Sequence, residues 1–345
     1  MKKIAQVLGS RRLTADVVMS MEVSARLGPR FSFDFLIPHG AEYRDELLRT
    51  GARVITLGDP ASLSRGQILA FARYFRANPA DVVHTHVSFS ARVGARLAGI
   101  RRCVSTRGFF DEESSGGGLI RMMLYNAFTS ATVCHLACMR DALVRQGARD
   151  DRLFPLYPSV CRSDPDEGAR AALPHGRVSI ICPLPYYRGF GQETLVRAFA
   201  RLPESLCDRL IFAGAGPLEE EYKNLANRLG VGERVEFYGE KMLTKVYNTP
   251  DYVVVLTQES RWEMPKLLLT GVASPIIASD TVANKELLQG ACEFFHRGDE
   301  YALERAILRL LNDADAFATA GRRAALAGVS MDLVCELHER VYAEA

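Results

Sequence analysis

The stretch VVVLTQESRWEMPKLLLTGVASPIIASD, residues 253–280, has the pattern of a strand, a loop, a helix and a second strand. Its two ends are short, β-branched and free of charge, as parallel strands covered on both faces are. Between them Pro265 suits the first turn of a helix, where its missing N–H costs nothing. The loop after a parallel strand lies at the carboxyl edge of its sheet, where open α/β folds bind ligands. We therefore expect Glu259 and Glu263 to lie in a ligand-binding loop before a helix start that favours an anion.

The same alternation of short apolar runs and helical segments extends along the rest of the chain. The strands are expected at 4–8, 31–37, 53–57, 82–84, 103–106, 134–137, 178–182, 209–213 and 234–238. The helices are expected at 16–27, 43–49, 64–76, 90–98, from 119 onward, 192–200 and 218–229. Repeated β-α units with short loops predict doubly wound parallel sheets in an α/β protein.

The alternation stops in the polar segment RSDPDEGARAALPHGR, residues 162–177, which has the composition of a domain linker. We expect an N-terminal Rossmann-like domain over 1–162, a linker over 163–177 and a C-terminal Rossmann-like domain over 178–330, facing each other across a cleft. The closing helical segment, 331–345, follows a complete second domain and is expected to pack back on the first.

Composition excludes disorder as the main state, because 48% of the 345 residues are apolar. No run approaches the roughly 18 apolar residues of a spanning helix, and the start MKKIAQVLGS lacks the apolar core of a signal peptide, so a cytoplasmic protein is expected. The eight cysteines are scattered. In the Cys134-His135-Cys138 cluster, apolar packing is favoured over a metal site, because no second Cys/His pair stands at zinc spacing.

Charge is unevenly distributed along a chain whose net charge is only +2. Residues 1–162 hold 23 Lys+Arg against 14 Asp+Glu, whereas the remainder holds 20 against 27. A basic first half indicates an anionic partner such as phosphates or the surface of a membrane, although solvated arginine-rich helix faces explain it equally well. Nucleic acid is not an expected partner, because no basic run is interleaved with aromatic residues.

Three segments resemble the GT-B fold glycosyltransferases, specifically the retaining enzymes of family 4. They are LIFAGAGPLEEEYKNLANRLGVGERVEFYGE at 210–240, ADVVHTHVSFSARVGARLAGIRRCVSTRG at 80–108, and PIIASD at 275–280. The resemblance covers nearly the whole chain in order. The alternative is another protein with two Rossmann-like domains, such as a sugar epimerase.

The resemblance implies a nucleotide-sugar donor held mainly by the second domain, an acceptor held mainly by the first, and no cofactor or obligatory metal. In the family an arginine and a lysine meet the charge that grows on the leaving diphosphate. The corresponding segment here is ICPLPYYRGF, residues 181–190, with Pro183 in place of that arginine and Arg188 in place of the lysine. Arg188 therefore takes the diphosphate role, and its alternative is a solvated loop arginine.

The donor signature of the family, two glutamates separated by seven residues, is altered here. Glu263 takes the place near the sugar, with Glu259 as its rival, while Thr270 replaces the glutamate on the ribose. We predict Glu263 and Arg188 as catalytic. The further residues predicted to bind the donor are Gly9, Ser10, Arg107, Gly214, Gly216, Pro217, Glu259, Met264, Pro265, Lys266 and Thr270.

The first domain also departs from the family. Gly9-Ser10 is followed by RRLTAD instead of a second glycine, and Arg107 stands in TRG where the family has a histidine in THG. His84 and His86, at the end of the fourth strand, are expected to be structural. These departures remove one cation but keep or supply two others, Arg107 and Arg188.

The sequence therefore predicts a cytoplasmic hexosyltransferase, working at the inner face of the membrane on a glycan, lipid-linked or small-molecule acceptor. The expected reaction moves a hexose from a nucleoside diphosphate sugar, with retention, to a cell-envelope polysaccharide, lipopolysaccharide or small molecule. The alternative is a GT-B subunit that binds a nucleotide or glycan without catalysis.

Overall fold

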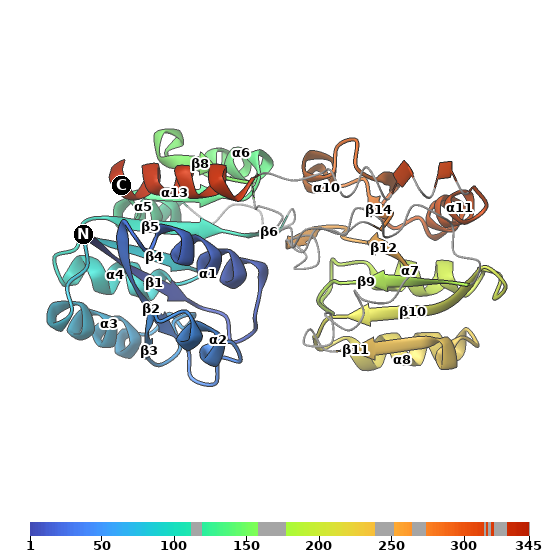
Figure 1. Ribbon diagram of the computed structural model, residues 1–345, viewed down its shortest axis with the longest axis horizontal. Helices are drawn as coiled ribbons and strands as arrows, with labels where there is room; N and C mark the ends of the chain where they lie inside the picture. Colours follow the sequence, from blue (N-terminus) through green and yellow to red (C-terminus); the bar gives the residue numbers. More distant parts are fainter. Residues whose placement is uncertain are drawn as a thin grey trace. The chain divides into compact units, whose positions relative to one another are not determined.

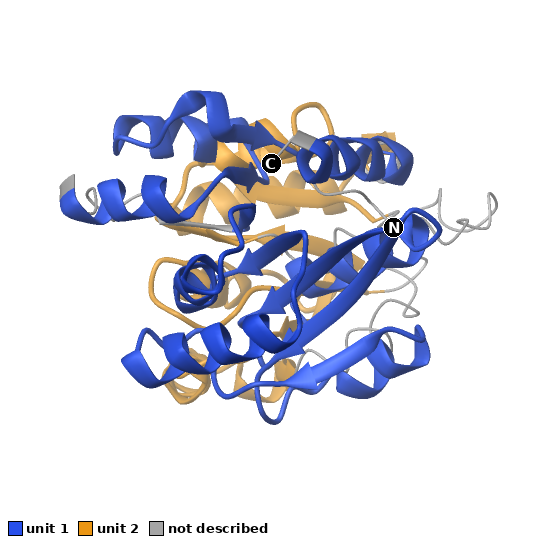
Figure 2. Cartoon of the chain, turned by 90° about the vertical axis from the view of Figure 1, so that its left-hand side faces the viewer, with its two compact units in different colours: residues 1–108, 114–159, 329–345 blue, residues 109–113, 160–328 orange. Residues whose placement is uncertain are grey.

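A computed structural model describes residues 1–111, 119–157, 177–238, 252–263, 274–313, 315–316, 319–320 and 330–344. The chain forms two compact units, coloured separately in Figure 2. Unit 1 comprises residues 1–108, 114–159 and 329–345, and unit 2 comprises residues 109–113 and 160–328.

Unit 1 is a seven-stranded parallel sheet with helices on both faces (Figure 1). The strand order is β3-β2-β1-β4-β5-β7-β8. Its elements in chain order are β1 (Lys2–Leu8), α1 (Ala15–Leu27), β2 (Phe31–Ile37), α2 (Arg44–Arg49), β3 (Arg53–Thr56), α3 (Arg65–Ala77), β4 (Val82–His86), α4 (Phe89–Leu97), β5 (Cys103–Arg107), α5 (Leu119–Phe128), β7 (Ala131–Cys134), α6 (Ala137–Arg145), β8 (Leu153–Pro155) and α13 (Met331–Glu344).

The two faces of this sheet carry separate apolar cores, because successive side chains of a strand point to opposite faces. On β2, Leu36 joins the core that contains Phe71 of α3, whereas Phe35 joins the core that contains Leu47 of α2. The right-handed crossovers of a doubly wound sheet place α3 and α4 on the face opposite α1 and α2. Helix α13 contacts α1 and belongs to unit 1.

Unit 2 contains a six-stranded parallel sheet in the order β11-β10-β9-β12-β14-β15. Its elements in chain order are β6 (Phe109–Asp111), β9 (Val178–Cys182), α7 (Gln192–Phe199), β10 (Cys207–Ala213), α8 (Glu219–Arg228), β11 (Val235–Tyr238), β12 (Tyr252–Leu256), β13 (Arg261–Glu263), β14 (Ile276–Ser279), α10 (Val282–Leu287), β15 (Glu293–Phe295) and α11 (Glu300–Leu311). The predicted α/β class with two doubly wound parallel sheets is confirmed.

One segment of the first half belongs to unit 2. Strand β6 pairs in antiparallel fashion with β13, and Phe109 lies opposite Glu263. Residues 109–113 were expected in the N-terminal domain, and this part of the prediction is wrong because the backbone hydrogen bonds of β6 are made with β13. Nothing in the alternation of the sequence marks so short a pairing between distant residues.

Two other local expectations differ from the structure. The strand expected at 134–137 lies earlier, over Ala131–Cys134, and Ala137 already begins α6. In the stretch that opens at Val253, strand β13 occupies part of the expected loop. The linker call, 163–177, and the helix expected from Met264 lie outside the described residues, except for Arg177. Among the described helices, none is long and apolar enough to span a membrane.

Candidate functional site

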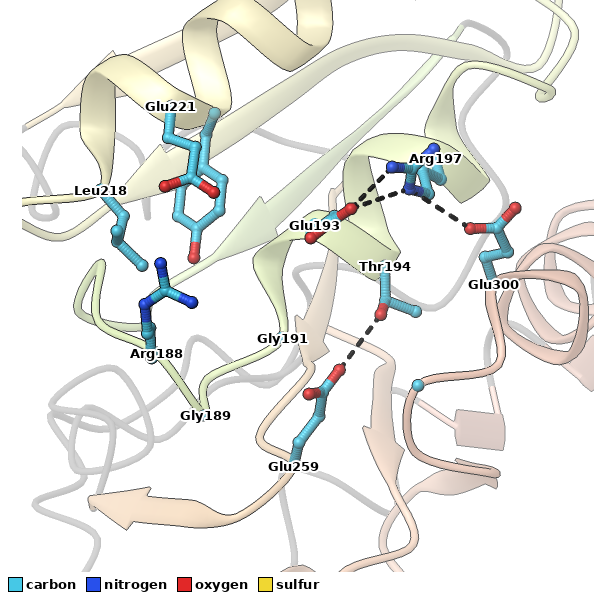
Figure 3. A pocket seen from close by; sticks show the side chains of 12 residues that line it. Arg188, Gly189, Gly191, Glu193, Thr194, Arg197, Leu218, Glu221, Glu259 and Glu300 are labelled. Carbon is cyan, nitrogen blue, oxygen red and sulfur yellow. Dashed lines mark hydrogen bonds and ion pairs between the residues drawn. The ribbon is translucent and has the colours of Figure 1, made fainter.

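A pocket of about 370 Å³ lies in unit 2 beside the loops that follow β9 and β12 and the first turns of α7 and α8. Strands β10, β9 and β12 are neighbours in the sheet, so the loops that follow them meet at the carboxyl edge. This edge is where open α/β sheets bind ligands. Figure 3 shows the side chains that line the pocket, among them Arg188, Thr194, Glu221 and Glu259.

Gly189 joins the β9 loop to the loop after β12. Its carbonyl accepts hydrogen bonds from the backbone N–H groups of Glu259, Ser260 and Arg261, at 3.0, 3.2 and 3.1 Å. Gly189 has φ of 87°, a left-handed conformation that favours glycine. The backbone hydrogen bonds to Gly189 therefore hold Glu259 beside the pocket.

Gly191 lies at the N-cap of α7 with φ of 69°. A Cβ added there would lie 2.2 Å from the carbonyl oxygen of Thr257 and 2.9 Å from Oε1 of Glu259. Only glycine fits this position, since such a Cβ would overlap backbone. The hydroxyl of Thr194, in the first turn of α7, donates to Oε1 of Glu259 at 3.2 Å. The glycine and the threonine together fix where the Glu259 carboxylate lies.

The two guanidinium groups of the pocket differ in their partners. Arg197 is neutralised by Glu193 at 2.6 Å and Glu300 at 3.7 Å (Figure 3). Arg188 is exposed and makes no hydrogen bond or ion pair with any residue that the structure describes. Arg188 is thus the guanidinium left to bind an anionic ligand here, and its planar fork suits phosphate.

The predicted donor residues Gly214, Gly216 and Pro217 do not line this pocket. A Cβ on Gly214 would lie 2.3 Å from the carbonyl oxygen of Leu184, and one on Gly216 would lie 2.3 Å from that of Tyr186. These glycines therefore allow the β10 loop to pack against the β9 loop, and their contact with a donor stays a prediction. Their contribution is to position the loop that carries Arg188.

The two glutamates of the opening stretch occupy different places. Glu259 lines the pocket with Arg188. Glu263 lies on β13, where its backbone carbonyl accepts a hydrogen bond from Nε2 of Gln258 at 3.1 Å. The sequence placed Glu263 in a loop directly before a helix, and the structure places it in a strand. Which of the two is the acid near the sugar stays a prediction.

Gly9 and Ser10 follow β1 at the carboxyl edge of the unit 1 sheet. The N–H of Gly9 donates to the carbonyl of His86 at 3.0 Å, and a Cβ on Gly9 would lie 2.8 Å from the same oxygen. The Ser10 hydroxyl accepts a hydrogen bond from the backbone N–H of Arg12. The backbone carbonyl of Ser10 accepts a hydrogen bond from the Tyr43 hydroxyl at 2.7 Å. Both residues therefore shape a tight turn, and their donor contact stays a prediction.

Arg107 ends β5 at the same edge of unit 1. Its guanidinium lies over the ring of Tyr125, 5.2 Å from the centroid, and its Nε is buried with no partner among the described residues. Nearby, the carboxylate of Asp16 touches Gly108, where a Cβ would lie 2.3 Å from Oδ1, and pairs with Nε2 of His135 at 3.3 Å. The position of Asp16 was not predicted from the sequence, because it depends on the close approach of its carboxylate to Gly108, the residue after β5.

His84 and His86 are buried and lie among polar partners. Nε2 of His86 lies 3.0 Å from the Ser20 hydroxyl, and Nε2 of His84 lies 2.7 Å from the Thr106 hydroxyl. Burial lowers the pKa of His86 to about 4. These are properties of neutral core histidines, as the sequence suggested.

Cys134 is also buried, and burial raises its pKa to about 12. Within the described part of the chain, no group of three or more His, Cys, Asp or Glu side chains is arranged to hold a metal ion. The preference for packing over a metal site in the Cys134-His135-Cys138 cluster stays a prediction.

Met264, Pro265, Lys266 and Thr270 lie outside the described residues, and their roles remain predictions. Several residues of the pocket were missed from the sequence: Glu193, Thr194, Arg197, Leu218, Glu221, Tyr222, Gly298 and Glu300. The pattern Arg188-Gly189-x-Gly191 could have indicated Glu193 and Thr194, because two closely spaced glycines predict a turn at the start of the following helix. Glu300 follows β15, and no local pattern connects it with this loop.

Two doubly wound parallel-sheet units, one with a pocket at the carboxyl edge of its sheet, have the architecture of the GT-B fold. Residues 177–313 match the family described as Glycosyl transferases group 1, so unit 2 carries a glycosyltransferase group 1 domain. EpsD of Bacillus subtilis (strain 168), a candidate glycosyltransferase, is 26% identical over 259 residues, which cover 67% of this chain and 67% of that protein.

Solved structures share the fold over the whole chain. Anabaena HepE in complex with UDP and glucose matches with a TM-score of 0.80 and 18% identity, covering 100% of both chains. Sucrose-phosphate synthase of Thermosynechococcus elongatus matches with a TM-score of 0.72 and 18% identity, again covering 100% of both chains. The predicted resemblance to GT-B glycosyltransferases is confirmed at the level of the fold.

Proposed function

We propose that this protein transfers a hexose from a nucleoside diphosphate sugar, with retention, to a cell-envelope polysaccharide, a lipopolysaccharide or a small molecule. The observation that carries the proposal is that Arg188, which has no partner among the described residues, and the fixed carboxylate of Glu259 line the same pocket of the group 1 domain. A guanidinium meets the charge that develops on a leaving diphosphate, and a carboxylate accepts hydrogen bonds from sugar hydroxyls.

UDP-glucose is the first donor to test. HepE, which shares the fold, has been solved with UDP, with UDP and glucose, and with UDP-glucose. The proposed enzyme is cytoplasmic, works at the inner face of the membrane and needs no metal. The pocket holds four carboxylates against two guanidiniums, and Thr270 replaces the ribose-binding glutamate, so donor affinity should be modest.

The test measures binding by calorimetry and turnover by release of the nucleoside diphosphate, for UDP-, GDP- and ADP-sugars, with and without EDTA. Arg188→Ala should weaken donor binding and lower turnover by about 100-fold, the loss seen when one group that stabilises developing charge is removed. Arg228→Ala removes an exposed charge from the other end of α8 and is the matched control. An anomeric assignment of the product by NMR tests retention.

The alternative, a subunit without catalysis, predicts different results. Binding of a nucleotide that depends on Arg188, with no release of sugar from any donor, would support it. Absence of nucleotide binding to the folded protein would oppose the transferase and leave the alternative of a subunit that binds a glycan.

A further inference from the structure

Two arginines of unit 1 lie over one aromatic ring. The guanidinium carbons of Arg92 on α4 and Arg107 at the end of β5 lie 5.3 and 5.2 Å from the ring centroid of Tyr125 on α5. The Tyr125 hydroxyl lies 2.6 Å from the hydroxyl of Thr132 on β7. Arg92 donates to the hydroxyl of Thr85 on β4 at 2.9 Å. Because β5 lies between β4 and β7, the two guanidiniums are anchored on three adjacent strands.

No carboxylate of a described residue compensates these two charges. Arg92 is only 4% exposed, and its guanidinium forms one hydrogen bond within the described part of the chain, to Thr85. Its Nε, like that of Arg107, is buried without a partner. The elements that surround the pair, β4, β5, β7, α4 and α5, contain no aspartate or glutamate. Such a pair is unusual, because buried arginines ordinarily have a counter-ion.

Two like charges held together in the interior are unfavourable. Burial lowers the pKa of Arg92 to about 10, and the positive charge of Arg107 acts in the same direction. The guanidinium therefore remains charged at neutral pH. Contact with the rings of Tyr125 and Phe89 offsets part of the desolvation cost. An anion that both guanidiniums contact would supply the charge that the protein lacks here.

Arg107 connects this interior pair with the carboxyl edge of the unit 1 sheet. It is the last residue of β5 and is half-buried, whereas Arg92 is buried. Open α/β sheets bind ligands at this edge. An anion that enters there would meet Arg107 first and Arg92 deeper in the unit.

We propose that Arg92 and Arg107 bind an oxyanion of the acceptor, either the carboxylate of an acidic sugar or the phosphate of a phosphorylated one. The planar fork of a guanidinium donates paired hydrogen bonds to both kinds of group, which a neutral sugar cannot replace. The inference rests on the proposed function for the molecule that carries the anion, whereas the anion site itself depends only on unit 1. It gives the acceptor a chemical class.

The experiment measures the binding of three probes to the full chain by calorimetry, at constant ionic strength. The probes are inorganic phosphate, methyl glucuronide and methyl glucoside. The wild-type protein should bind an anionic probe and not the neutral glucoside. Tighter binding of the glucuronide assigns the site to an acidic sugar, and tighter binding of phosphate assigns it to a phosphorylated one. Arg92→Met and Arg107→Met should each weaken that binding by at least about tenfold, because each removes a hydrogen bond to a charged group.

Arg96→Met is the matched control on the same helix. Arg96 also has a buried Nε without a partner, but it donates to the carbonyl of Ala127 at 3.1 Å, one turn further along α4. This variant should bind the anionic probe as the wild type does. Arg188→Ala removes the free cation of the unit 2 pocket and should also keep the binding. Binding that is lost in Arg188→Ala and kept in Arg107→Met would place the anion in unit 2 and overturn the proposal.

Thermal unfolding separates an anion site from a structural role of Arg92. In chloride buffer Arg92→Met should be at least as stable as the wild type, because an apolar side chain of similar length replaces an uncompensated buried charge. The anionic probe should raise the melting temperature of the wild type and not that of the variant, since it binds only the folded wild type at this site. A less stable variant whose probe binding is unchanged would show that Arg92 serves only the fold, and would overturn the proposal.

UDP binding, measured in parallel, separates this inference from the proposed function. A wild-type protein that binds UDP but neither anionic probe would overturn the anion site alone. Binding of a probe without binding of UDP would support the anion site and oppose the transferase. If Arg107→Met weakens the binding of UDP but not of the probe, Arg107 holds the diphosphate of the donor, and the proposal is overturned.

Discussion

The hydroxyl of Tyr342 lies 2.9 Å from Nδ1 of His84, although 258 residues separate them in the chain. The same hydroxyl accepts a hydrogen bond from Nε2 of Gln6 at 2.8 Å. Both contacts are buried, and His84 also reaches the Thr106 hydroxyl through Nε2. Helix α13 is therefore bound to the central strands of unit 1 by polar contacts that water does not share.

Tyr342→Phe should destabilise unit 1, because it leaves Gln6 and His84 with an unmade buried hydrogen bond each. The expected cost is about 1–3 kcal/mol per unsatisfied group. Denaturant unfolding of wild type and variant measures it. Tyr301→Phe, at a side chain 58% exposed, is the control and should change stability by little. Equal stability of the Tyr342 variant and the wild type would show that water replaces the hydroxyl.

Stability should fall as the pH is lowered below 6.5. Burial lowers the pKa of His86 and His338 to about 4, and it lowers that of His84 as well. These side chains stay neutral in the folded chain while the unfolded chain takes up protons below its pKa of about 6.5. The contribution of each such histidine to the free energy of unfolding is fully present above pH 6.5. It is lost as the pH falls toward 4, at about 1.4 kcal/mol per pH unit.

Denaturant unfolding at several pH values measures this slope. His338→Gln should remove about one histidine's share of it, whereas His39→Gln, at an exposed side chain, should leave the slope unchanged. The neighbours that face these histidines include Asp16 and His135, so both variants should be compared in the same salt. A slope that does not depend on His338 would contradict the assignment.

The strand and helix alternation of both units was predictable because it depends on local periodicity. Runs such as Val253–Leu256 are apolar on both faces, and this property is readable without knowledge of any partner. The pairing of β6 with β13 was not predictable, since it depends on hydrogen bonds between residues about 150 positions apart. The packing of Gly214 was not predictable for a similar reason: the sequence shows a glycine but not that Leu184 lies against it.

Arg188 was found from its place in a segment that resembles the family, and the structure adds that it has no partner among the described residues. Thr194 was not found, because a threonine in a helical pattern carries no signal until Glu259 lies beside it. Long-range geometry therefore decides which of the charged residues of unit 2 form a site, while local pattern decides only where the loops are.

Gly191→Ala should destabilise unit 2 and weaken nucleotide binding. The added Cβ would overlap the carbonyl of Thr257 and would also hold a positive φ. Gly290→Ala is the matched control, because Gly290 has φ of 76° but nothing within 4 Å of the added Cβ. The control should cost about 1–3 kcal/mol from backbone strain alone. Denaturant unfolding should show a larger loss for Gly191→Ala, and equal losses would indicate that the β9 loop moves to accept the methyl group.

The last prediction separates the two glutamates of the opening stretch. Glu259→Gln keeps the shape of the side chain and the hydrogen bond from Thr194 but removes the charge that would support the sugar in the transition state. Transfer should fall by about 100-fold or more, with a much smaller change in the donor dissociation constant measured by calorimetry. Glu263→Gln, on β13, should change transfer less than Glu259→Gln does, and Glu221→Gln controls for loss of charge elsewhere in the pocket. If Glu263→Gln gives the larger loss, the acid near the sugar is Glu263, as the spacing in the sequence suggested, and the carboxylate of Glu259 serves only to hold the first turn of α7.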